Sequence, residues 1–141
     1  LQLIFTLKPR LQQEQLIIGE SVFDVDLTSL LKGSKVDEDG YLVSAEGKKY
    51  DLKDADVIAE IPLNAIEIID GFDNGNVNGI IASTIYIGDH YQIMVRTSEE
   101  EDFILESPYT WNVDDAVSLI IPKDKIKLTV KGDISKYVIE A

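Results

Sequence analysis

The chain has 141 residues, of which 45% are hydrophobic and 28% are charged, a composition that fits one compact domain or two very small ones. Its formal charge of -13 argues against nucleic acid as a partner, because phosphate backbones are bound mainly through Lys and Arg. The absence of cysteine excludes disulfides and thiolate metal ligands, and no apolar run reaches the roughly 18 residues of a membrane-spanning helix. We expect a soluble protein whose acidic surface serves mainly solubility.

We interpret residues 1–15 as a connector or as an N-terminal segment that does not match the rest of the chain. The alternation at the start is imperfect, and Pro9 ends it, because proline cannot donate a hydrogen bond to a strand ladder. Further on, Phe23, Val25 and Leu27 alternate with aspartates. This period of two predicts a half-buried strand.

Short strands separated by glycine turns are predicted next. Asp39-Gly40 lies between two segments that can pair, which is the strongest short hairpin signal in the sequence, and Glu46-Gly47 marks a second turn. Residues 57–61 are predicted to form a strand that stops at Pro62. Residues 70–76 form the most turn-rich stretch of the chain and are predicted to join two halves.

The stretch from 79 to 105 predicts a three-stranded meander. Its first strand is rich in β-branched residues and ends at Gly88-Asp89, a dipeptide suited to a tight turn. Residues 90–97 alternate in polarity, which predicts a strand with one buried face. The acidic run that follows is assigned to a hairpin tip, after which Phe103 and Leu105 resume the inward face.

The two halves carry a related segment. Residues 61–68 and 121–128 lie sixty positions apart and share the pattern Ile-Pro-x-x-x-Ile-x-aliphatic. We favour a genuine internal repeat over chance recurrence of a strand, a proline stop and a second strand. Because proline suits the first helical position, one helical turn is predicted after each proline, at 63–65 and 123–125.

Together these patterns predict an all-β protein with little helix, for which two small five-stranded β-barrels are the most economical architecture. Turns recur every roughly 8–12 residues, which fits small barrels or sandwiches rather than βαβ units. The predicted units are residues 16–70 and residues 71–141, the second with a C-terminal tail. The sequence leaves open whether the halves form separate barrels or exchange strands.

No residue is predicted to be catalytic, to bind a cofactor or to hold a metal. A P-loop needs Gly-x-x-x-x-Gly-Lys followed by Ser or Thr, and the only Gly-Lys pair, Gly47-Lys48, lacks both the upstream glycine and the hydroxyl. The single histidine, His90, lies inside an alternating strand, where packing or solvation is favoured over catalysis. Neighbouring carboxylates such as Asp114-Asp115 do not by themselves make an acid and a base with separated pKa values.

Two features are candidates for an effector or interface site. The acidic run at 99–102 could attract a cation or a polyamine, although a solvated hairpin tip is the favoured interpretation. An aromatic pair at 109 and 111 could form a stacking platform for a ring, and burial over the open end of a barrel is the favoured alternative. The candidate residues are Glu99, Glu100, Glu101, Asp102, Tyr109 and Trp111.

The sequence of the predicted meander resembles that of a known protein family. Residues 86–92, Tyr-Ile-Gly-Asp-His-Tyr-Gln, are followed by Val-Arg-Thr at 95–97 and by Glu-Glu-Asp-Phe at 100–103. With Ile-Gly-Glu-Ser at 18–21, they resemble the C-terminal TOBE domain of ATP-binding subunits of bacterial spermidine/putrescine ABC importers. The resemblance covers about residues 16–130, and Gly-Asp-His-Tyr is its most specific part for the polyamine branch.

The resemblance implies OB-like small β-barrels of the TOBE type. They would form a regulatory and dimer-supporting domain on the cytoplasmic side, peripheral to the inner face of the cell membrane. Its implied partners are the ATPase domain of the same protein, a second copy of the chain and, indirectly, the membrane subunits of the transporter. ATP and Mg²⁺ would belong to the parent subunit and not to this chain. Ile61 stands where the family usually has arginine before the proline, so contacts of that arginine do not carry over. An oxyanion-binding TOBE module is the alternative.

Overall fold

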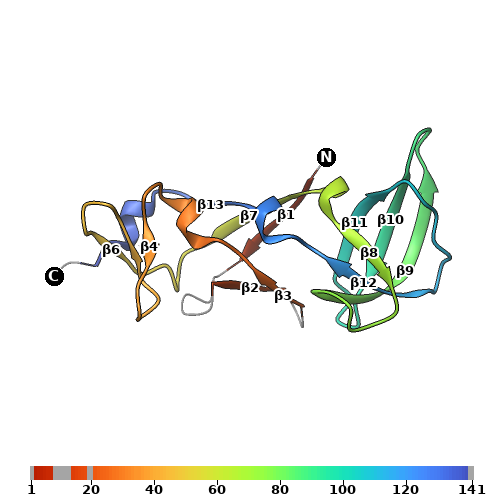
Figure 1. The fold of residues 1–141 in the computed structure, drawn as a ribbon, viewed down its shortest axis with the longest axis horizontal. Coiled ribbons are helices and arrows are strands. Elements are labelled where there is room, and N and C mark those ends of the chain that lie inside the picture. Colours follow the sequence, from red (N-terminus) through yellow and green to blue (C-terminus); the bar gives the residue numbers. More distant parts are fainter. Residues whose placement is uncertain (1, 8–13, 19–20, 140–141) are drawn as a thin grey trace.

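The protein has an all-β fold, and every helix among its described residues is a short 3-10 helix. A computed structural model describes residues 2–7, 14–18 and 21–139. Within these residues the longest helices have four residues, and the chain is otherwise organised as small antiparallel sheets. Figure 1 shows an elongated molecule with a curled sheet at one end and a small sheet beside the C-terminus at the other. The predicted fold class is confirmed.

The largest sheet has five strands in the order β11-β10-β9-β12-β8 and curls into a half-barrel. The meander predicted between 79 and 105 is confirmed, since β9, β10 and β11 are consecutive antiparallel neighbours. The inward side chains of Phe103 and Leu105 are fully buried, as predicted. The strands are β8 (Glu67–Asp70), β9 (Val77–Tyr86), β10 (Tyr91–Arg96), β11 (Asp102–Ser107) and β12 (Ala116–Ile120).

Three smaller sheets complete the described chain. One has the order β1-β7-β13, the second is the hairpin β2-β3, and the third has the order β4-β5-β6. Both predicted glycine turns are confirmed, because they join β4 to β5 and β5 to β6. The strands are β1 (Gln2–Leu7), β2 (Gln15–Ile18), β3 (Ser21–Asp24), β4 (Lys35–Val36), β5 (Leu42–Val43), β6 (Lys49–Tyr50), β7 (Val57–Pro62) and β13 (Lys127–Val130).

The N-terminal part of the chain differs from the sequence prediction in two places. Residues 2–7 of the predicted connector form β1, which pairs with β7, whereas residues 1, 8–13 and the Gly-Glu pair at 19–20 lie outside the described residues. The strand predicted around residues 23–27 is wrong beyond its first part, because β3 ends at Asp24. Asp26 instead caps the 3-10 helix η2 (Leu27–Leu30), its carboxylate accepting a hydrogen bond of 3.1 Å from the Thr28 N–H.

The helical turn predicted after each repeat proline is confirmed as η3 (Leu63–Ala65) and η4 (Lys123–Lys125). The prolines were expected at the first helical position, but Pro62 and Pro122 lie one residue earlier, at the N-cap. Their backbones nearly coincide, with φ and ψ of -60° and 135° at the first proline and -64° and 133° at the second. In each case the turn leads into a strand, β8 or β13, at the same spacing.

The two related segments exchange strands. In one ladder Val57 of β7 pairs with Val130 of β13, and the positions sixty residues away, Val117 of β12 and Asp70 of β8, pair in the other ladder. Every other pair of the two ladders obeys the same rule. The two strand-turn-strand units are therefore related by an approximate two-fold axis, which supports the internal repeat. Strands on both sides of the predicted division at 70/71 share sheets. The division into two units stays a prediction.

Two hydrophobic cores stabilise the molecule. The main core fills the half-barrel and the adjoining sheets, with Phe23, Val57, Ile81, Ile93 and Val117 among its fully or almost fully buried members. A small second core lies under the β4-β5-β6 sheet. The helix η5 (Ile134–Tyr137) covers it, and the C-terminal segment is pinned there by the Ile139 N–H, which donates to the Lys49 carbonyl at 2.8 Å.

Candidate functional site

The acidic run lies at the tip of the β10–β11 hairpin, as predicted. The turn is held by the Thr97 N–H donating to the Glu101 carbonyl at 2.9 Å and by the Glu100 N–H donating to the Thr97 carbonyl at 3.0 Å. The Thr97 hydroxyl also accepts from the Glu101 N–H at 3.1 Å. Glu100 has a φ of 62°, and both Glu99 and Glu100 are exposed. This geometry favours a solvated turn.

Asp102 is separated from the other three carboxylates by its own partner. It faces Arg96 across the β10–β11 ladder and forms a two-point ion pair with it, with Nε–Oδ1 at 2.8 Å and Nη2–Oδ2 at 3.2 Å. The hydrogen bond from the Arg96 guanidinium lowers the pKa of Asp102, and the same contact raises the pKa of Arg96. The four residues that the sequence groups together therefore do not form one set of free carboxylates.

Tyr109 and Trp111 lie on the loop between β11 and β12. Tyr109 is 75% exposed, whereas Trp111 is half-buried and packs against the main core. The loop is pinned to β9, because the Asp114 N–H donates to the Ile81 carbonyl at 2.8 Å and the Ile81 N–H donates to the Asp115 carbonyl at 3.0 Å. The two aromatic side chains thus stand on a supported loop.

Both aromatic residues line a shallow groove bordered by residues of β8, of β11 and of the loop that joins β11 to β12. Two adjoining open depressions share Ile68 and Tyr109 in their walls, and η3 packs against β11 beside them. We call this feature the seam groove. Its main lining side chains are Glu67, Ile68, Glu106, Tyr109, Trp111 and Asp115.

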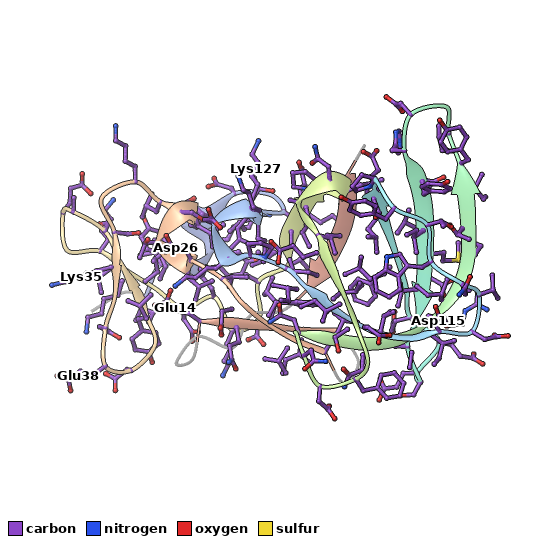
Figure 2. The ribbon with its side chains drawn as sticks, turned by 45° about the vertical axis from the view of Figure 1, so that its right-hand side comes forward. Glu14, Asp26, Lys35, Glu38, Asp115 and Lys127 are labelled. Atoms are coloured by element: carbon purple, nitrogen blue, oxygen red, sulfur yellow. The ribbon has the colours of Figure 1, made fainter. Side chains whose placement is uncertain are left out.

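The half-barrel carries most of the negative charge of the chain. Residues 67–121 contain eleven carboxylates and one basic residue, Arg96, a formal charge of -10 out of the total of -13. Figure 2 shows the labelled lysines, Lys35 and Lys127, away from Asp115 and the half-barrel. The carboxylates are Glu67, Asp70, Asp73, Asp89, Glu99, Glu100, Glu101, Asp102, Glu106, Asp114 and Asp115.

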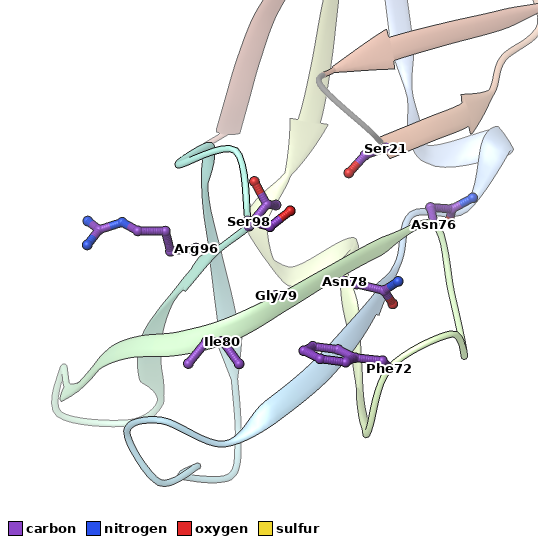
Figure 3. A pocket seen from close by; sticks show the side chains of 9 residues that line it. Ser21, Phe72, Asn76, Asn78, Gly79, Ile80, Arg96 and Ser98 are labelled. Atoms are coloured by element: carbon purple, nitrogen blue, oxygen red, sulfur yellow. The ribbon is translucent and has the colours of Figure 1, made fainter.

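A second cavity, of about 340 Å³, lies on another face of the half-barrel and is shown in Figure 3. Its amides are engaged in holding the fold, because Asn76 accepts from the Ile121 N–H at 2.9 Å and Asn78 accepts from the Asp73 N–H at 2.7 Å. In Figure 3 the Arg96 side chain points away from Phe72 and Asn78. An oxyanion would find at this cavity one basic side chain, which is already paired with Asp102.

The single histidine is half-buried beside two carboxylates. His90 Nδ1 lies 2.5 Å from Asp89 Oδ1, and Nε2 lies 3.8 Å from Glu106 Oε1. Among the described residues no group of three or more His, Asp or Glu side chains is arranged to hold a metal ion. No helix in the described ranges combines the length and the apolar character needed to cross a membrane.

Fold and surface define a class of protein: a small all-β domain of OB-like sheets with an acidic half-barrel. No family model matches the chain. It is 27% identical over 73 residues to the spermidine/putrescine import ATP-binding protein PotA of Bacteroides thetaiotaomicron and 26% identical over 74 residues to that of Bacteroides fragilis. Each match covers 52% of this chain and 16% of the relative, so the chain corresponds to a small part of the relatives' length.

The sequence did not identify Glu67, Ile68 or Glu106 as neighbours of the aromatic pair. Glu67 follows the repeat proline by five positions, and Glu106 is an alternating residue on β11. They come together with the pair only in the folded chain, and no local pattern reports which distant residues line one depression. Asp115 follows Trp111 closely in the sequence and lines the same depression, so this is the one neighbour that a spacing argument could have found.

Proposed function

We propose that the chain is a TOBE-like accessory domain of the ATP-binding subunit of a polyamine ABC importer, where it supports dimerisation or regulation. The observation that carries the proposal is the similarity to two spermidine/putrescine import ATP-binding proteins over about half of this chain. The all-β fold agrees with a part of such a subunit that does not itself hold nucleotide. Fold alone does not assign a function, so the proposal depends on that similarity.

In this proposal ATP hydrolysis belongs to another part of the parent subunit. The sequence has no glycine loop followed by lysine and a hydroxyl, and phosphoryl transfer needs such a cradle together with Mg²⁺. The partners are the ATPase domain of the same protein, a second copy and, through them, the membrane subunits. The domain would work on the cytoplasmic side, peripheral to the membrane, with ATP and Mg²⁺ bound by the parent subunit.

Two measurements on the chain test the proposal. A fluorescent ATP analogue with Mg²⁺ should not bind to the chain. In size-exclusion chromatography the chain should elute together with the ATP-binding subunit or the permease complex of the polyamine importer from the same organism. A chain that binds and hydrolyses ATP by itself would overturn the assignment. So would a chain that elutes separately from every subunit of that importer.

A further inference from the structure

One buried hydroxyl group in the described part of the chain has no hydrogen-bond partner there. The buried polar side chains of that part are the serines Ser21, Ser44, Ser107 and Ser118. Ser44, Ser107 and Ser118 each form a hydrogen bond with a backbone group. Ser21 is 5% exposed, and its hydroxyl has no partner among the described residues. Because buried polar groups normally have a partner, the Ser21 hydroxyl is an exception that needs a physical cause.

The Ser21 hydroxyl lines the cavity of about 340 Å³ that Figure 3 shows, which we call the Ser21 cavity. Ser21 is the first residue of β3, and its oxygen points toward Ser98, another lining residue. Among the described residues no side-chain oxygen or nitrogen is both fully enclosed and unpartnered, so the Ser21 oxygen keeps some access. The cavity gives that access. A molecule inside the cavity can therefore supply the partner that the fold does not.

The hydrogen-bonding groups left over around the cavity are mainly donors. Asn78 Oδ1 accepts from the Asp73 N–H at 2.7 Å and lies 3.2 Å from the Ser118 hydroxyl, whereas its amide nitrogen uses one of two hydrogens, on Asp73 at 3.0 Å. Asn76 likewise uses one amide hydrogen, on a backbone carbonyl at 3.3 Å. The Thr97 hydroxyl accepts a backbone N–H at 3.1 Å and keeps its own hydrogen to donate. A fitting ligand therefore carries acceptor oxygens.

The charges around the cavity select an uncharged ligand. Its described lining residues include no carboxylate, so an ammonium ion finds no counter-ion there. The basic side chain that lines it, Arg96, is paired with Asp102. The formal charge of -10 on residues 67–121 repels anions. Neutral carbonyl oxygens satisfy the donors without either penalty.

The cavity also has an apolar wall. Phe72, on the turn between β8 and β9, is 49% exposed, and in Figure 3 its ring points toward Ile80 of β9. An accessible aromatic ring favours stacking with another flat ring. The volume lies at the lower end of the range of about 300–1,000 Å³ that is usual for ligand pockets, so the ligand must be small.

We propose that the Ser21 cavity binds a small, uncharged, carbonyl-bearing heteroaromatic ring, which is the chemistry of a pyrimidine base. The ring stacks on Phe72, and its carbonyl oxygens accept hydrogen bonds from the Ser21 hydroxyl and from the remaining amide hydrogen of Asn78. Such binding goes beyond the accessory role proposed above and does not depend on it.

The test is an NMR titration of the ¹⁵N-labelled chain with uridine. We expect saturable shifts of the side-chain amide signals of Asn76 and Asn78, and no shift of the Trp111 indole N–H, which belongs to a different depression. Ribose, which lacks the ring, should shift none of these signals. Unmoved Asn76 and Asn78 signals in uridine, or equal shifts in ribose, would overturn the proposal.

Uridine 5′-monophosphate tests the selection against charge. It carries the same ring with a phosphate, and it should bind more weakly than uridine because the negative potential of the half-barrel repels it. The difference should shrink as the ionic strength rises. Tighter binding of the monophosphate would contradict an uncharged ligand.

Two serine variants separate a ligand contact from a structural role. Ser21→Ala should raise the Kd for uridine about fivefold through the loss of one hydrogen bond, and should unfold at the same urea concentration as the parent chain. Ser44→Ala is the matched buried control: it should bind uridine as the parent chain does but unfold at a lower urea concentration, because the Lys48 N–H loses its acceptor. Unchanged binding in Ser21→Ala would refute the site.

A further pair tests the stacking wall. Phe72→Ala should raise the Kd for uridine about threefold, while Phe72→Tyr, which keeps the ring, should bind as the parent chain does. The dispersion of the amide spectrum checks that each variant is folded. Equal affinity of the folded Phe72→Ala variant and the parent chain would reject the stacked ring.

Discussion

At the scale of single residues, Gly79 shows how one missing side chain shapes the half-barrel. A Cβ atom there would lie 2.5 Å from Val95 Cγ1 and 2.9 Å from the Arg96 carbonyl oxygen, next to the register shift of the β9–β10 ladder at Met94 and Val95. Such contacts force the strands apart. Glycine therefore permits the close approach on which the curl of the sheet depends.

We expect Gly79→Ala to destabilise the protein by about 1–3 kcal/mol in urea unfolding, because a methyl group has no space there. Gly47→Ala is the comparison variant, because a Cβ at Gly47 meets nothing within 4 Å. There the φ of 87° alone should lower the free energy of unfolding, by about 1 kcal/mol, since residues other than glycine are strained in this conformation. A Gly79 variant as stable as the parent chain would contradict the steric argument.

The Arg96–Asp102 pair predicts a definite pH dependence. Because Arg96 lowers the pKa of Asp102 in the folded state, this carboxylate contributes stability above its unfolded pKa of about 3.9, and the contribution is lost as the pH falls through the lower folded value. An NMR titration should find Asp102 below its ordinary pKa in the parent chain and back near it in Arg96→Gln. Identical titration curves in the two proteins would contradict the pairing.

At the scale of elements, the exchange of strands between the repeated segments makes the halves interdependent. β12 needs β8 as a neighbour, and β13 needs β7, so each half presents unpaired strand edges when it is alone. The buried positions Ile61 and Ile121 occupy equivalent places in the two units. One core is therefore built from both segments.

We expect fragments 1–70 and 71–141 to be unfolded when expressed separately, as judged by poorly dispersed amide spectra. Mixing them should restore dispersion, since the two ladders can then form between chains. The intact chain serves as the control. A well-dispersed spectrum from fragment 71–141 alone would show that the second half is an independent domain, and the exchanged pairing would not be required for folding.

At the scale of the whole molecule, the sequence predicts the fold class and the positions of strands and turns better than it predicts how distant strands are arranged in space. Alternation and glycine turns predicted the meander and the two turns around residues 40 and 47, because these depend on neighbours in the chain. The cap at Asp26 was missed, because an aspartate in an alternating pattern fits both a strand and a helix start. The seam groove could not be predicted, since Glu67 and Glu106 lie far apart in the sequence and line one depression only in the folded chain.

The two cores are expected to differ in local stability. The second core consists of Leu42, Tyr50, Leu52 and Ala55 and lies at the far end of the molecule from the half-barrel (Figure 1). Regions with few buried neighbours open more readily than the rest of a fold. We expect Leu52→Ala to cost about 2–4 kcal/mol locally, which hydrogen exchange would detect as faster exchange of the amides in β4, β5 and β6.

The unfolding transition reported by Trp111 should keep its midpoint in Leu52→Ala, because this tryptophan packs against the main core. Ile93→Ala provides the matched control: it removes a fully buried side chain of the same volume class from the main core and should lower that midpoint. If Leu52→Ala moved the Trp111 transition as far as Ile93→Ala does, the two cores would unfold as one unit. Leu30 and Val36, which pack against both cores, would then be the side chains that couple them.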